Sequence, residues 1–172
     1  MQKEQLAARH FTTSAIHIVE QLGPRAADRS IHTKLTEQTI PMLALWSVLR
    51  WERKVGLVAL ERVGVEIDSL ARDVDRALEA ACEEVRRRTG PPKLQTLPSG
   101  QRCMVVDSQA PLAPLLVAAE HEALGFGHNW VGTEHLLLAV VRLADSRLRE
   151  VLERHRVTYE EVRRAVLELL QS

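Results

Sequence analysis

The hydrophobic pattern is clearest in the second half of the chain, where it predicts helices. The apolar run 136–141 is rich in leucine and short, so we interpret it as a buried helix with Thr133 as its N-cap and an end near Leu143. A last helix is expected after Thr158, because Glu161 three residues later completes a capping box. Its apolar positions recur at helical spacing, at Val162, Val166, Leu169 and Leu170.

Two further helices complete this half. One is expected from a cap at Ser108 to about Leu124, with Pro114 in the sequence favouring a later start. A short helix is expected from about Ser146 to Arg154. Together these segments predict a unit of about four helices.

The first half repeats this plan in a degenerate form. Residues 55–65 line up with 147–157, and in that register 40–43 fall on 132–135. A long helix follows from Ile67 to about Val85 and ends at Gly-Pro-Pro, residues 90–92. A first helix is expected near 12–22. The pattern predicts an all-α fold class of two pseudo-repeats of about four helices each, without a substantial sheet.

We expect one domain over residues 1–172. The degenerate repeat covers about 11–89, the well-matched repeat covers about 108–172, and the Pro- and Gly-containing residues 90–107 form a linker, with 104–106 as a candidate extended piece. The predicted core residues come from both repeats: Leu45, Val48, Leu49, Leu60, Leu136, Leu137, Val140, Leu152, Val162 and Leu169.

The composition argues against nucleic-acid binding, a membrane span and a disulfide-rich fold. The formal net charge is zero, so no nucleic-acid partner is expected, and no apolar run approaches the roughly 20 residues of a membrane span. Only 3% of the residues are aromatic, which favours helices packed through aliphatic side chains. Cys82 and Cys103 lack the spacing of a zinc site or a disulfide framework, and the polar N-terminus favours a cytoplasmic location.

Catalytic and cofactor motifs are not found. None of the four lysines follows a glycine, so a P-loop is excluded, and Gly-x-Ser-x-Gly is absent. His121, His128 and His135 are spaced by seven residues, but glycines between them break any common helix. We therefore expect histidines that brace a loop rather than a metal site, no cofactor, and no enzyme activity.

The strongest candidate for a binding site is the corner formed by Gly132, Thr133, Glu134 and His135. The first turn of a helix leaves backbone N–H groups unpaired and attracts anions, while the Glu134 carboxylate can pair with a guanidinium. A phosphorylated arginine carries both groups. The alternative is that Thr133 only caps the helix and Glu134 only complements its dipole.

The stretch Gly127-His-Asn-Trp-Val-Gly-Thr-Glu-His135, followed by three leucines, resembles the signature of the Clp ATPase N-terminal (Clp R) domain family. The resemblance implies an all-α domain of two repeats that recognises substrates. It also implies a role for Glu134, because domains of the ClpC type recognise phosphoarginine with this glutamate. In the first repeat, Pro41 and Met42 occupy the Thr-Glu positions, so we expect at most one such site.

The expected function is therefore that of a non-catalytic accessory or adaptor that contacts a Clp ATPase, the Clp peptidase or Clp substrates. Trp46 and Trp51 are candidate anchors for a partner, since tryptophan is favoured at binding hot spots, although both could instead fill the core of the degenerate repeat. The alternatives are a degenerate paralogue that serves an unrelated protein partner or, with less support, an enzyme with an unrecognised site.

Overall fold

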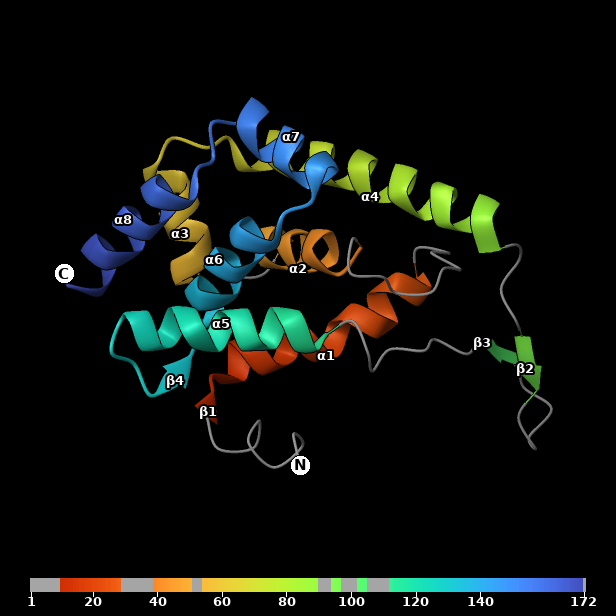
Figure 1. Cartoon of the computed structure of the whole chain (residues 1–172), viewed down its shortest axis with the longest axis horizontal. Coiled ribbons are helices and arrows are strands. Elements are labelled where there is room, and N and C mark those ends of the chain that lie inside the picture. The colour runs from red at the N-terminus through yellow and green to blue at the C-terminus, as the bar shows by residue number, and fades with distance from the viewer. Residues whose placement is uncertain are drawn as a thin grey trace.

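The computed structural model describes residues 10–28, 39–50, 54–89, 94–96, 102–104 and 112–171, and these residues are almost entirely helical (Figure 1). The first-half helices are α1 (Thr13–Asp28), α2 (Thr39–Arg50), α3 (Val55–Arg62) and α4 (Ile67–Thr89). The second-half helices are α5 (Ala113–Gly125), α6 (Thr133–Leu143), α7 (Ser146–Arg154) and α8 (Tyr159–Leu170). The predicted all-α fold of two four-helix repeats is confirmed.

Extended structure within the described residues is limited to two short strand pairs. β1 (His10–Phe11) runs parallel to β4 (Trp130–Val131), and so joins the residues before α1 to the loop before α6. β2 (Leu94–Thr96) is antiparallel to β3 (Arg102–Met104) within the predicted linker. Of the expected extended residues 104–106, only Met104 lies in a described strand.

The turns after α3 and α7 show that the two halves repeat the same local structure. Gly64 has φ +83° and Arg156 has φ +57°, and both lie two residues after the end of their helix. In the next residue the Val65 N–H donates to the Leu60 carbonyl at 3.1 Å, and the Val157 N–H donates to the Leu152 carbonyl at 2.8 Å. These positions agree with the alignment of 55–65 with 147–157.

The two repeats interlock around one core. The third helix of each repeat packs against the fourth helix of the other, so that α3 contacts α8 and α7 contacts α4 (Figure 1). Two arginines at equivalent positions bridge these junctions: Arg62 lies 3.6 Å from Glu168 of α8, and Arg154 lies 3.4 Å from Asp73 of α4. Residues of both repeats therefore belong to one hydrophobic cluster.

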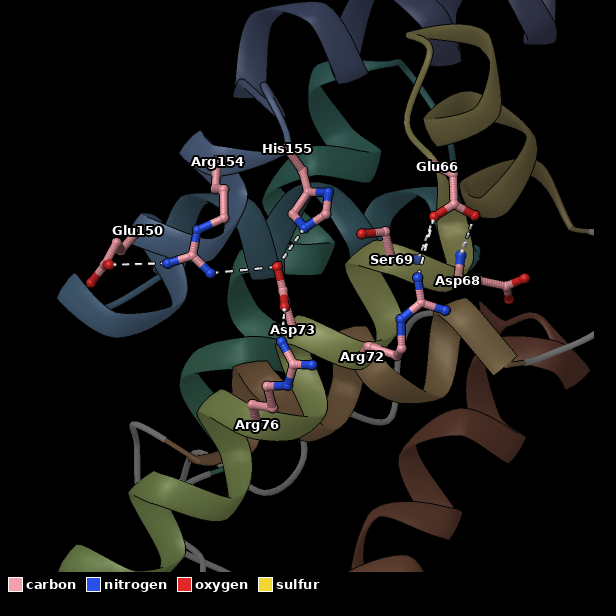
Figure 2. Close-up of polar contacts among 9 residues, drawn as sticks. All are labelled: Glu66, Asp68, Ser69, Arg72, Asp73, Arg76, Glu150, Arg154 and His155. Carbon is pink, nitrogen blue, oxygen red and sulfur yellow. Dashed lines mark hydrogen bonds and ion pairs between the residues drawn. The ribbon is translucent and has the colours of Figure 1, made fainter.

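The α4–α7 junction is held by polar contacts that converge on Asp73 (Figure 2). Its carboxylate lies 2.9 Å from His155 Nε2, 3.4 Å from Arg154 and 3.1 Å from Arg76. The hydrogen bond from His155 is the main reason that the pKa of Asp73 is lowered, with Arg154 adding to the effect. The C-terminal end of α7 is thus bound to α4 of the first repeat by ion pairs and hydrogen bonds.

Nearly all of the predicted core residues are buried, and the two repeats share one hydrophobic cluster. Leu136 and Leu137 of α6 are fully buried, as is Leu60 of α3. Leu169 is an exception: it is only half-buried, because it lies in the last turn of α8 at the edge of the core.

The helix boundaries follow the local signals with two differences. Thr158 caps α8 as predicted, by a 3.3 Å hydrogen bond from the Glu161 N–H to Thr158 Oγ1, while the Glu161 carboxylate accepts the Thr158 hydroxyl at 2.7 Å rather than the Thr158 backbone N–H of a full capping box. α5 begins at Ala113 with Pro114 in its first turn, as that proline favoured, and the proposed cap Ser108 lies outside the described residues. α1 extends past the expected end near residue 22 to Asp28.

The longest helix, α4, has 23 residues, but charged side chains surround its single apolar stripe. Across the described part of the chain, no helix combines the length and the apolar character needed to cross a membrane.

Candidate ligand-binding corner

The N-terminal end of α6 differs from the predicted cap by one residue. Gly132, not Thr133, is the N-cap residue, with an extended backbone, and Thr133 is the first residue of the helix. Since glycine has no side chain to act as a cap, His135 reaches back instead: its Nδ1 accepts the Gly132 N–H at 2.8 Å. This is the reciprocal half of a capping box, made by an imidazole in place of the usual Glu or Gln.

His135 is neutral and its hydrogen bonds fix its tautomer. The side chain is fully buried, and burial, with a contribution from nearby His128, lowers its pKa to about 4. Because Nδ1 accepts the Gly132 N–H, the ring proton is on Nε2, from which it reaches His128 Nδ1 at 3.1 Å. His128 in turn stacks on Trp130 with ring centroids 4.4 Å apart.

These contacts confirm that His128 and His135 brace the loop before α6. His121 is exposed on α5 and does not join them. Within the described ranges no group of three or more His, Cys, Asp or Glu side chains is placed to hold a metal ion.

Glu134 is buried at the same corner, with 3% of its surface exposed. Its carboxylate folds back over Gly132, where any side chain would overlap it. Oε2 is 3.4 Å from the Thr133 hydroxyl, a long hydrogen bond. Oε1 lies 3.5 Å from His135 Nδ1, but that nitrogen carries no proton, and no described residue gives Oε1 a hydrogen bond. Burial raises the pKa of Glu134.

A second buried glutamate is paired more completely. Glu122 of α5 is also 3% exposed. Its Oε2 accepts the Tyr159 hydroxyl of α8 at 2.6 Å, and its Oε1 forms an ion pair with the Arg142 guanidinium of α6 at 3.0 Å. This network, which the sequence did not suggest, ties three helices together: Oε2 has a hydrogen bond, and Oε1 has an ion pair without hydrogen-bond geometry. Among the described residues, Glu134 has no arginine or lysine within ion-pair distance, and its side-chain partners are the Thr133 hydroxyl and His135.

The first turn of α3 packs against the backbone of this corner. A Cβ on Gly56 would lie 3.1 Å from the Thr133 carbonyl oxygen, so the two backbones are nearly in contact. Consequently all four predicted site residues are brought together as expected, but all four are buried. The glycine in the first turn of α3 is the one faint sign of this contact in the sequence.

Comparison with known proteins agrees with this geometry. Residues 110–172 match the family model of the Clp repeat (R) N-terminal domain. The matched residues are those of the second repeat, and they support a likeness to the Clp N-terminal domain. It is 28% identical over 162 residues to a probable ATP-dependent Clp protease ATP-binding subunit of Chlamydia pneumoniae, and the match covers 94% of this chain but 17% of that relative.

Solved structures support the fold over nearly the full length. The Hsp104 N-terminal domain from Candida albicans is similar with a TM-score of 0.60 and 16% identity, over 93% of this chain and 91% of that one. A chain from structural investigations of a malarial protein secretion system has a TM-score of 0.63 and 20% identity, over 92% of each chain. At these identities the likeness concerns the fold.

The corner of the first repeat lacks the carboxylate of the second. Pro41 and Met42, which align with Thr133 and Glu134, are buried in the first turn of α2. α2 is buried along its whole length from Thr39 to Leu49, so this helix serves as the centre of the core.

The prediction of Trp46 as an exposed anchor is wrong. Trp46 is 8% exposed because it lies on the buried helix α2, and the Arg50 guanidinium lies 4.8 Å from the centre of its ring. It fills the core of the degenerate repeat, which was the alternative interpretation. Trp51 lies outside the described residues.

Proposed function

We propose that this protein acts by binding, as a cytoplasmic accessory or adaptor in Clp-dependent protein quality control. Its partners would be a Clp ATPase, the Clp peptidase or their substrates. The proposed ligand of the α6 corner is an arginine or phosphoarginine side chain on such a partner. The match to the Clp repeat family supports a protein-interaction role, and the chemistry of the corner supports the ligand.

The observation that carries the proposal is the incompletely paired carboxylate of Glu134. A buried charge without partners is costly, and most buried polar groups in proteins are hydrogen-bonded. Oε1 of Glu122 and Oε1 of Glu134 both lack a hydrogen bond from any described residue, but Glu122 Oε1 forms an ion pair with Arg142 and Glu134 Oε1 has no arginine or lysine partner among the described ion pairs. A guanidinium would supply the missing donors in a two-pronged pair.

The backbone at the same corner suits an anion. The first N–H groups of a helix have no partner within the helix, and in α6 the first intrahelical bond is from the Leu136 N–H to the Gly132 carbonyl, at 3.2 Å. The N–H groups of Thr133, Glu134 and His135 precede it, and of these the Glu134 N–H has its own carboxylate as an acceptor. With the positive end of the helix dipole they favour a phosphate, so phosphoarginine matches both halves of the corner.

The state of His135 supports binding rather than catalysis. Both of its ring nitrogens serve structural hydrogen bonds, to Gly132 and to His128. A general base needs a free nitrogen within reach of a substrate proton, and neither nitrogen meets that condition.

The test is a titration with phosphoarginine, followed by backbone NMR shifts and calorimetry. We expect shifts at Gly132–His135 and none at Ile40–Leu43, the equivalent corner without a carboxylate. Glu134→Ala should weaken binding by about 1.5–3 kcal/mol, the size of a charge-assisted hydrogen bond.

Glu160→Ala is the matched control, because Glu160 is the second residue of α8 as Glu134 is of α6, but is exposed. It should leave affinity unchanged. Free arginine and phosphoserine as ligands separate the guanidinium from the phosphate contribution. Equal shifts at both corners, or no shift at either, would refute the proposal.

A further inference from the structure

Helices α3, α7 and α8, which lie at the two junctions between the repeats, differ in how their N-terminal ends are capped. α7 has a side-chain cap: Asp145 Oδ1 accepts the Leu148 N–H at 2.9 Å. α8 is capped by Thr158. Lys54 occupies the N-cap position of α3 with the usual extended backbone, φ −117° and ψ 167°, but makes no side-chain cap.

The composition of the first turn of α3 weakens it further. A lysine at the N-terminal end opposes the helix dipole and offers no acceptor for the first N–H groups. Gly56, the second residue of α3, has a lower helix propensity than every other residue type except proline. The first turn of α3 is therefore easier to open than the first turn of its counterpart α7.

This turn is the part of α3 that lies on the α6 corner. At Gly56 a Cβ atom would lie 3.1 Å from the Thr133 carbonyl oxygen and 3.5 Å from the Glu134 nitrogen. The second turn of α3 is the more deeply buried of the two, since Ala59 and Leu60 are fully buried and Leu57 of the first turn is 8% exposed. The first turn can therefore open while the second turn stays in the core.

We propose that the first turn of α3, residues 55–58, is a hinged cover over the Glu134 corner that opens by local fraying and closes again. The inference rests on the proposed function, in which a ligand must reach Glu134. It explains how a site can be assembled yet buried. The ionised carboxylate of Glu134 favours the open state, where water or a guanidinium can solvate it, over the closed state, where no described residue gives Oε1 a hydrogen bond.

Amide hydrogen exchange tests the cover without any ligand. The Val58 N–H donates to the Lys54 carbonyl at 3.0 Å, so its exchange reports the opening of the first turn of α3. The Glu134 and His135 amides lie in the first turn of α6, where burial protects them in place of an intrahelical bond. If the cover is right, all three amides exchange through one opening event.

Two variants should change the frequency of this opening in opposite directions. Lys54→Ser provides a cap and should slow exchange at all three amides by about 5-fold. Leu57→Ala removes a side chain that is 8% exposed in the closed turn, and should accelerate all three by about 10-fold or more, after correction for global stability through the Leu137 amide. Asp145→Ala, which removes the cap of the equivalent helix α7, should leave the corner amides unchanged.

The outcomes separate the cover from the ligand. Parallel changes at Val58, Glu134 and His135 support the cover, and about 5-fold weaker phosphoarginine binding by Lys54→Ser then supports both proposals. Parallel changes in a protein that binds no phosphoarginine would support the cover and overturn the proposed ligand. Faster exchange at Val58 alone in Leu57→Ala would overturn the cover, whether or not phosphoarginine binds.

Discussion

Replacement of Glu134 by a neutral side chain should stabilise the protein at neutral pH. This expectation is opposite in sign to that for an ordinary acidic residue in the first turn of a helix, where loss of the charge removes about 0.3–1 kcal/mol of favourable dipole interaction. Here the carboxylate is 3% exposed and Oε1 has no hydrogen bond from any described residue. An unsatisfied buried group of this kind costs about 1–3 kcal/mol or more when charged.

The net change in the free energy of unfolding is the cost of the buried carboxylate that is relieved, minus the favourable dipole interaction that is lost. Glu134→Gln keeps the shape, and Glu134→Met avoids leaving the Gln amide protons without acceptors. At pH 8 we expect the better of the two variants to be more stable than the wild type by about 1–2 kcal/mol, since relief of the buried charge exceeds the lost dipole interaction. Urea unfolding followed by far-UV circular dichroism measures this difference directly.

The pH dependence provides the second readout. Burial raises the pKa of Glu134, so the native state holds this proton more tightly than the unfolded state does. Wild-type stability therefore falls as pH rises from the unfolded value, near 4.5, to the raised value in the native state, and then levels off. The advantage of the variants should grow over that window. Variants that are less stable than wild type at pH 8, by an amount independent of pH, would refute the reasoning.

Three further predictions concern the core and its polar groups. The pKa of His135 is about 4 in the native state against 6.5 when unfolded, so the unfolded state takes up a proton first as pH falls. The free energy of unfolding should therefore fall by about 2–4 kcal/mol between pH 6.5 and 4. His135→Gln, which can still accept the Gly132 N–H, should reduce this pH dependence in urea unfolding. Leu137→Ala should cost about 2–5 kcal/mol of unfolding free energy, and a loss below about 0.5 kcal/mol would contradict its full burial. Tyr159→Phe should cost about 1–3 kcal/mol, because Glu122 Oε2 loses its donor, and an unchanged thermal midpoint would show that water replaces the hydroxyl.

The sequence by itself determined the helices and their repetition. The N-cap at Thr158, the apolar spacing along α8 and the leucine run of α6 are local signals, and local backbone energetics is sufficient to interpret them. The register that aligned 55–65 with 147–157 also predicted matching turns, because each turn returns a backbone N–H to its own helix. The turn requires a positive φ but not necessarily a glycine, since Arg156 adopts a positive φ at the position that aligns with Gly64.

Tertiary structure decided which of these elements face water. Trp46 and Glu134 carry side chains that are common on binding surfaces, yet both are buried, one in the central helix α2 and the other in the first turn of α6, against whose backbone α3 packs. The cap of α6 lies at Gly132 rather than Thr133 because His135 supplies the acceptor. Burial depends on contacts with residues far away in the chain, such as Gly56 against Thr133, and no spacing within the motif of α6 records that α3 lies over it.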